Sequence, residues 1–104
     1  MNYLSTRGNY KRVTAAEAIK TGMVPSGGLF VPEAFPKFEA EEIKSMAEKS
    51  YQEKAEMVFS KYLTDFSAEE IKKCIDGAYN SVNFASDKIA PVVKNGENFY
   101  ILEL

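Results

Sequence analysis

Apolar residues recur at helical spacing over two neighbouring stretches in the middle of the chain, residues 51–63 and 71–79. Each stretch follows a Ser-x-x-Glu capping box, which starts a helix: Ser50 with Glu53, and Ser67 with Glu70. The break between the two predicted helices is only residues 64–66, since Ser67 already caps the second one, so the sequence predicts an antiparallel helix pair whose apolar stripes face each other. Cys74 falls on the second stripe, where a cysteine is expected to be a small buried hydrophobe.

The first third of the chain predicts a short helix, a glycine turn and a short strand. Thr14 and Glu17 have capping-box spacing, and Gly22 can end the helix in a left-handed conformation. The stretch Pro25–Gly28 has turn chemistry, with a fixed φ followed by two glycines. Leu29–Val31 then predicts a brief buried strand, which the following proline closes.

Three more elements complete the pattern. Residues 3–5 predict an edge strand, and residues 39–49 predict a helix with Ile43, Met46 and Ala47 on one face. Asn95-Gly96 is a strong hairpin signal between residues 91–94 and a long apolar strand over 97–104. The predicted fold class is α+β: a small domain of three or four helices packed on two or three short strands, with a C-terminal β-hairpin.

Composition and charge narrow the function classes. The chain has 104 residues, the size of one domain, with 13 basic and 15 acidic residues and no basic stripe for nucleic acid. No apolar run approaches the roughly 20 residues that span a bilayer, and no signal peptide is evident, so a cytoplasmic protein without membrane partners is expected. One cysteine and no histidine exclude Cys/His metal sites and weigh against independent catalysis.

The turn Ser5-Thr6-Arg7-Gly8 is the main candidate for ligand chemistry. Two hydroxyls, a guanidinium and a glycine suit a phosphate, because arginine forks onto phosphate oxygens. The alternative is a surface turn with an exposed arginine, which composition alone favours. The glycines at Pro25–Gly28 lack the spacing of a phosphate-binding P-loop, so that turn is expected to be structural. The carboxylates Glu39, Glu41 and Glu42 are expected to complement a helix dipole in solvent rather than to catalyse.

Tyr3–Gly8 has the pattern Y-x-S-T-R-G, and Glu17–Glu33 has the pattern E-A-x-x-x-G-M-x-P-S-G-G-L-F-V-P-E. Together these motifs resemble the N-terminal segment of threonine synthases, which usually have aspartate where this chain has Ser26. The start of the helix at Ser50-Tyr51 and the final stretch Tyr100–Leu104 also fit, so the resemblance covers essentially the whole chain.

The resemblance implies a parent enzyme, a lyase of threonine biosynthesis that depends on pyridoxal 5′-phosphate (PLP). Such enzymes convert O-phosphohomoserine and water to threonine and phosphate, with a fold of the tryptophan synthase β type. Their PLP-binding lysine belongs to a segment like H-G-P-T-x-A-F-K-D, which would follow Leu104. Residues 1–104 are therefore expected to be the N-terminal domain of such an enzyme, without its PLP catalytic domain.

For the fragment alone, the resemblance implies no catalytic residue, no bound cofactor and no activity. Its partner would be its own C-terminal PLP domain. Ser5, Thr6 and Arg7 become candidates for binding the phosphate of the substrate. The uncovered apolar strand at the chain end independently favours truncation.

Two other interpretations remain open. The amphipathic pair 51–63 and 71–79 could belong to an autonomous helical adaptor that binds a partner helix in a groove. A more remote alternative is a small phosphate-binding module centred on residues 5–8.

Overall fold

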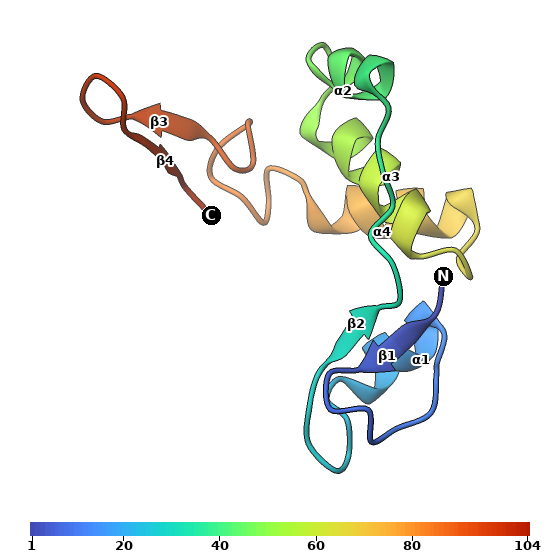
Figure 1. The fold of residues 1–104 in the computed structure, drawn as a ribbon. Coiled ribbons are helices and arrows are strands. Elements are labelled where there is room, and N and C mark those ends of the chain that lie inside the picture. Colours follow the sequence, from blue (N-terminus) through green and yellow to red (C-terminus); the bar gives the residue numbers. More distant parts are fainter.

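The computed structural model describes all of residues 1–104 and confirms the predicted α+β class. The helices are α1 (Ala15–Thr21), α2 (Ala40–Met46), α3 (Tyr51–Tyr62) and α4 (Ala68–Ala78). The strands are β1 (Tyr3–Ser5), β2 (Phe30–Pro32), β3 (Val92–Lys94) and β4 (Tyr100–Leu102). Figure 1 shows three parts: an N-terminal unit of β1, α1 and β2, a middle part of α2, α3 and α4, and a hairpin arm of β3 and β4.

The N-terminal unit is a small antiparallel sheet beside a short helix. Strand β1 pairs with β2, with Tyr3 opposite Pro32. The Thr14 hydroxyl caps α1 by accepting the Glu17 N–H at 3.2 Å, as predicted, but Glu17 does not complete the box because its carboxylate pairs with Lys11. The residues buried in this unit are Val13, Ala15, Ala18, Val24 and Ser5.

The prediction of a buried strand at Leu29–Val31 is wrong. Leu29 is 56% exposed and Val31 is 38% exposed, because only β1 lies beside β2 and no second layer covers these side chains. The closing proline, Pro32, is itself the last residue of β2. This residue can lie in the strand because the sheet has only two strands and both are edges.

The antiparallel helix pair is confirmed. The first turn of α3 lies beside the last turn of α4, where the Tyr51 and Tyr79 rings meet edge to face at 4.9 Å. Both predicted capping boxes are present. On α4 only Ile71 and Ile75 are buried, and the prediction that Cys74 is buried is wrong. A single neighbouring helix covers a narrow strip of α4, so the rest of its apolar stripe stays in solvent.

Helix α2 is shorter than the predicted 39–49 helix and buries no residue. Ile43, on its expected apolar face, is 57% exposed. The α2 region is attached to α3 by Lys61, whose ammonium lies 2.9 Å from the Glu42 carboxylate, 2.9 Å from the Lys37 carbonyl oxygen and 4.3 Å from the centre of the Phe38 ring. Polar and cation–π contacts therefore hold the α2 region against α3, whereas apolar packing holds α3 against α4.

Asp65, in the turn between α3 and α4, joins the helix pair to the N-terminal unit. Its carboxylate accepts the Ala16 N–H at 3.0 Å and so caps α1 from a distant part of the chain. The Tyr3 hydroxyl donates to the Tyr62 carbonyl nearby, at 3.2 Å. Partial burial alone would raise the pKa of Asp65, but hydrogen bonds from the start of α1 outweigh it and lower that pKa below its ordinary value.

The hairpin arm differs from its prediction in the turn and in strand length. Lys94 pairs with Tyr100, so Asn95-Gly96 lies in a five-residue loop, closed by a 2.8 Å bond from the Asn95 N–H to the Phe99 carbonyl, and not in a two-residue turn. The last strand covers Tyr100–Leu102 rather than residues 97–104. Every residue of β3 and β4 is exposed.

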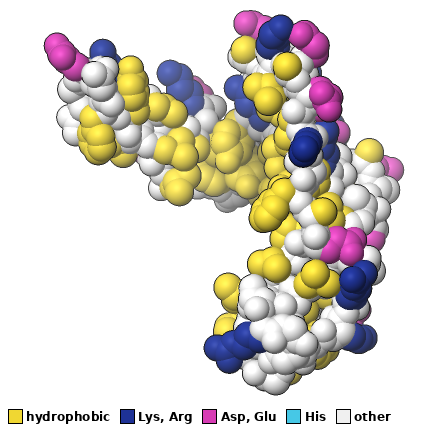
Figure 2. Space-filling view, viewed as in Figure 1, with side chains coloured by type: hydrophobic (Ala, Val, Ile, Leu, Met, Phe, Trp, Pro, Cys, Tyr) yellow, Lys and Arg dark blue, Asp and Glu magenta, His cyan; other side chains and the backbone are white.

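The three parts do not share one core. Only 8 of 104 residues are buried, and the radius of gyration is 16.4 Å, against about 13 Å for a compact domain of this size. Figure 2 shows hydrophobic side chains uncovered along the hairpin arm and on the neighbouring side of the helical part. None of the helices has the length and apolar character needed to cross a membrane.

Candidate functional site

Two turns that are distant in the sequence meet at the far end of the N-terminal unit. We call them the loop pair: residues 5–9, which begin at the last residue of β1, and residues 25–28, which precede β2. The Asn9 side-chain amide joins them, because its Nδ2 donates to the Ser26 hydroxyl at 3.0 Å, the Gly27 carbonyl at 3.1 Å and the Ser26 carbonyl at 3.3 Å. The structure thus brings the candidate turn at residues 5–8 into contact with the Pro25–Gly28 turn, which the sequence predicted to be structural.

Ser5 and Thr6, two of the predicted site residues, are hydrogen-bonded within this site. The buried Ser5 hydroxyl donates to Asn9 Oδ1 at 2.5 Å and accepts the Arg7 N–H at 3.2 Å. Thr6 Oγ1 accepts the Leu29 N–H at 3.0 Å. Both hydroxyls therefore hold the turns in place, and the exposed Thr6 retains its O–H as a donor.

Arg7, the third predicted site residue, is exposed and forms none of the ion pairs of the chain. Its guanidinium rests on the backbone of the second turn, where a Cβ on Gly27 would lie 2.8 Å from Nη1. Gly27 and Gly28 have φ of +88° and +109°, a region that residues with a side chain rarely adopt. The two glycines therefore allow the backbone of residues 25–28 to turn, and they leave room for the side chains of residues 5–7 to lie against it. A guanidinium without a counter-ion can bind an anion bidentately.

Asn9 is the residue of this site that the sequence interpretation missed. The signal was present but weak: a short turn with hydroxyls and an arginine, ending in an amide, followed after one helix by a Gly-Gly turn. Nothing in the local spacing showed that the two turns would be in contact.

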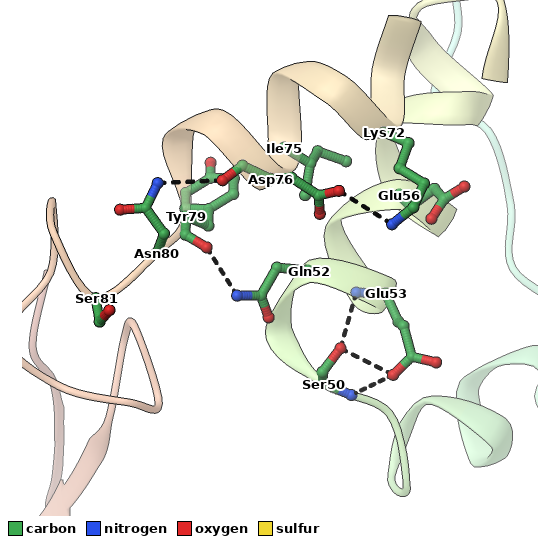
Figure 3. Close-up of a pocket in the computed structure, with 10 residues that line it drawn as sticks. All are labelled: Ser50, Gln52, Glu53, Glu56, Lys72, Ile75, Asp76, Tyr79, Asn80 and Ser81. Atoms are coloured by element: carbon green, nitrogen blue, oxygen red, sulfur yellow. Dashed lines mark hydrogen bonds and ion pairs between the residues drawn. The ribbon is translucent and has the colours of Figure 1, made fainter. Parts of the chain in front are cut away.

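A hollow of about 520 Å³ lies elsewhere, between α3 and α4 (Figure 3). Three of its charged groups are already engaged: Lys72 pairs with Asp76 at 3.2 Å, and the Glu53 carboxylate accepts the Ser50 N–H at 2.7 Å. Hydrogen bonds from the Ser50 backbone and hydroxyl lower the pKa of Glu53. Such a carboxylate is a helix cap rather than a proton-transfer group. No cluster of three or more His, Cys, Asp or Glu side chains that could hold a metal ion is present in the structure.

A smaller, apolar hollow, of about 260 Å³, runs along α3 between Tyr51 and Phe59. The adaptor interpretation would place a partner helix here. Its size and open form are those of a gap beside one helix rather than of a groove long enough for an amphipathic helix.

Comparison with known proteins assigns the chain to a family. Residues 2–79 match the family described as "Threonine synthase N terminus". The whole chain is 35% identical to threonine synthase of Schizosaccharomyces pombe over 106 residues, covering 20% of that protein, and 29% identical to threonine synthase of Methylobacillus glycogenes over 111 residues, covering 23%.

A solved structure shows the same fold. PLP-bound threonine synthase from Brucella melitensis superimposes with a TM-score of 0.88 and 32% identity, over 99% of this chain and 22% of that protein. The chain therefore spans about a fifth of the length of these relatives.

Proposed function

Because the chain belongs to the threonine synthase family, through that family's N-terminal domain, we propose that it works as the N-terminal domain of a PLP-dependent threonine synthase. The observation that carries the proposal is the family match over residues 2–79, with the same fold in a PLP-bound relative. The activity of the parent enzyme would be the conversion of O-phosphohomoserine and water to threonine and phosphate, a lyase step of threonine biosynthesis in the cytoplasm.

We propose that PLP binds outside this chain. The cofactor supplies an electron sink for carbanions when bound, and it needs an enclosed lysine for its aldehyde. No lysine side chain of this chain is fully buried, and the half-buried Lys61 has its ammonium engaged by Glu42 and by the Lys37 carbonyl. The residues present therefore do not fit a PLP site, and the fragment alone would be inactive.

The hairpin arm is the surface that we propose for contact with the catalytic part of the enzyme. An isolated two-stranded hairpin is at best marginally stable in water, and both edges of this one are open. Large apolar side chains cover it: Val92, Val93, Phe99, Tyr100, Ile101 and Leu102. The occupant would be the PLP domain, because about four-fifths of the length of each relative lies outside the part that this chain matches.

Docking of the hairpin arm on the PLP domain would help to enclose the active site. A domain that packs beside the cofactor domain can close over the substrate and exclude water from reactive intermediates. The chain would then contribute position and enclosure rather than a reacting group.

We further propose that the loop pair, through Arg7, binds the phosphate of the substrate, with the Thr6 O–H as a second donor and Ser5 as internal support. Replacing Arg7 by alanine in the full-length enzyme should raise KM for O-phosphohomoserine about 10- to 100-fold, since a hydrogen bond to a charged group is worth about 1.5–3 kcal/mol. Arg12→Ala is the matched control, because Arg12 is also exposed and makes only a 3.6 Å contact with Glu33. An unchanged KM in Arg7→Ala would refute this role.

The domain assignment is tested by sequencing the source gene beyond the codon for Leu104. A reading frame that continues into a segment like G-P-T-x-x-F-K-D, and several hundred further residues, would support it. A stop codon after Leu104 would overturn it and favour the adaptor interpretation, whose test is binding of an amphipathic helix along α3.

A further inference from the structure

We propose that Asn9 positions Arg7, so that the anion site of the loop pair depends on an amide that does not touch the anion. The inference rests on the phosphate-binding role proposed for Arg7. It is carried by the place of Asn9 in the structure, where its single side chain is bonded to both turns.

The Asn9 side chain is hydrogen-bonded to both turns of the loop pair. Its Oδ1 accepts from the Ser5 hydroxyl, and its Nδ2 has three acceptors on Ser26 and Gly27. Two further hydrogen bonds join the first turn to Leu29, the residue that follows the second turn. The Thr6 N–H donates to the Leu29 carbonyl, and the Leu29 N–H donates to Thr6 Oγ1, so both bonds lie at the strand side of the loops. Asn9 therefore fixes the outer side, where Arg7 lies.

Two routes lead from Asn9 to Arg7. On the backbone side, the Ser5 hydroxyl that donates to Asn9 also accepts the Arg7 N–H. On the side-chain side, the guanidinium rests against Gly27, whose carbonyl accepts from Asn9 Nδ2. Loss of the amide would free both supports of Arg7 together, without altering its charge.

Gly27→Ala perturbs the same position by another route. The added Cβ would stand 2.8 Å from Arg7 Nη1, so the guanidinium has to move while the hydrogen bonds of Asn9 can persist. Ser26→Ala is the matched control, because it removes one of the three acceptors of Asn9 Nδ2 and leaves both carbonyls.

The experiment measures kcat and KM for O-phosphohomoserine in the full-length enzyme with Asn9→Ala, Gly27→Ala, Ser26→Ala, Arg7→Ala and the double variant Asn9→Ala/Arg7→Ala. We expect Asn9→Ala and Gly27→Ala to raise KM roughly three- to tenfold with kcat unchanged, because the charged hydrogen bond is displaced rather than removed. Ser26→Ala should have little effect. In the Arg7→Ala background, Asn9→Ala should have no further effect on KM.

An equal factor for Asn9→Ala in both backgrounds would overturn the inference, as would an unchanged KM in Asn9→Ala when Arg7→Ala raises it. If Arg7→Ala itself leaves KM unchanged, the phosphate role fails. The positioning role is then decided by NMR of the 104-residue chain. An ordered Arg7 Nε–H signal that is lost in Asn9→Ala and kept in Ser26→Ala would support it, and a signal unchanged in Asn9→Ala would refute it.

Discussion

Replacement of Gly28 by alanine should destabilise the protein more than any other glycine-to-alanine change in the loop pair. Gly28 has φ of +109°, and an added Cβ would lie 3.2 Å from Thr6 Oγ1 and 3.3 Å from Ser5 Oγ. These two oxygens cannot move freely, because each is held by a backbone N–H, that of Leu29 and that of Arg7 respectively. At Gly27 the added Cβ would meet only the flexible end of the Arg7 side chain.

The expected magnitude follows from three terms. A residue with a side chain held in a sparsely populated region at positive φ loses about 1–3 kcal/mol, and alanine recovers about 0.4–1 kcal/mol by restricting the unfolded chain. Weakening one or both of the crowded hydrogen bonds adds about 0.5–1.5 kcal/mol. The net loss for Gly28→Ala is about 2–3 kcal/mol, a large part of the 5–15 kcal/mol that is usual for a domain.

The assay is urea unfolding of the 104-residue chain, followed by circular dichroism, with two matched controls. Gly8 has φ of +64° and open space around its Cβ position, so Gly8→Ala isolates the backbone term of about 1–2 kcal/mol. Gly77 is an exposed residue inside α4 with no atom within 4 Å of that position, so Gly77→Ala should stabilise the protein by about 1 kcal/mol. If Gly28→Ala were no more destabilising than Gly8→Ala, the close contact of the two turns would be refuted.

Three further predictions concern other parts of the molecule. Asp65→Asn should lower the free energy of unfolding by about 0.3–1 kcal/mol at neutral pH, because the cap of α1 loses its charge. The folded-state pKa of Asp65 is lowered, so this difference is present above the ordinary aspartate pKa of 3.8 and should vanish as the pH falls through the folded-state value. A difference that persists in acid would contradict the charge argument. The exposed Cys74 should react with a thiol reagent as fast in the native chain as in urea, and a thiol that reacts only in urea would contradict its exposure. The chain should self-associate at high concentration through the hairpin arm and Ile101→Lys should prevent this in sedimentation experiments, whereas a strictly monomeric wild type would refute the open edge.

Local chemistry made most of the elements predictable. Capping residues act within four positions of a helix start, and glycine or proline acts on its own φ, so Thr14, Ser50 and Ser67 located three helix starts and Gly22 located one helix end. Ser5, Thr6 and Arg7 were identifiable as a turn for the same reason.

The burial of side chains was not predictable, because it depends on which other element packs against the apolar face of a helix or strand. The sequence predicted the apolar faces of α2, α4 and residues 29–31, yet Ile43, Cys74 and Leu29 on these faces are exposed because no element of this chain lies over them. The contact of Asn9 with Ser26 and Gly27 was missed for a related reason. It joins residues 17 and 18 positions apart across a helix, and no short-range rule describes such a pairing.

The cap that Asp65 places on α1 sets an order of events in folding. Helix α1 has seven residues, well below the ~12–15 at which an isolated helix becomes marginally stable, and the carboxylate that caps it lies 49 positions later. The α3–α4 hairpin closes over a short loop and can nucleate first, whereas α1, which Thr14 caps locally, gains this second, charged cap only when that hairpin has formed. Substitutions at Ile75 should therefore slow refolding, and substitutions at Asp65 should mainly speed unfolding. The N-terminal unit, although first in the sequence, would be completed late.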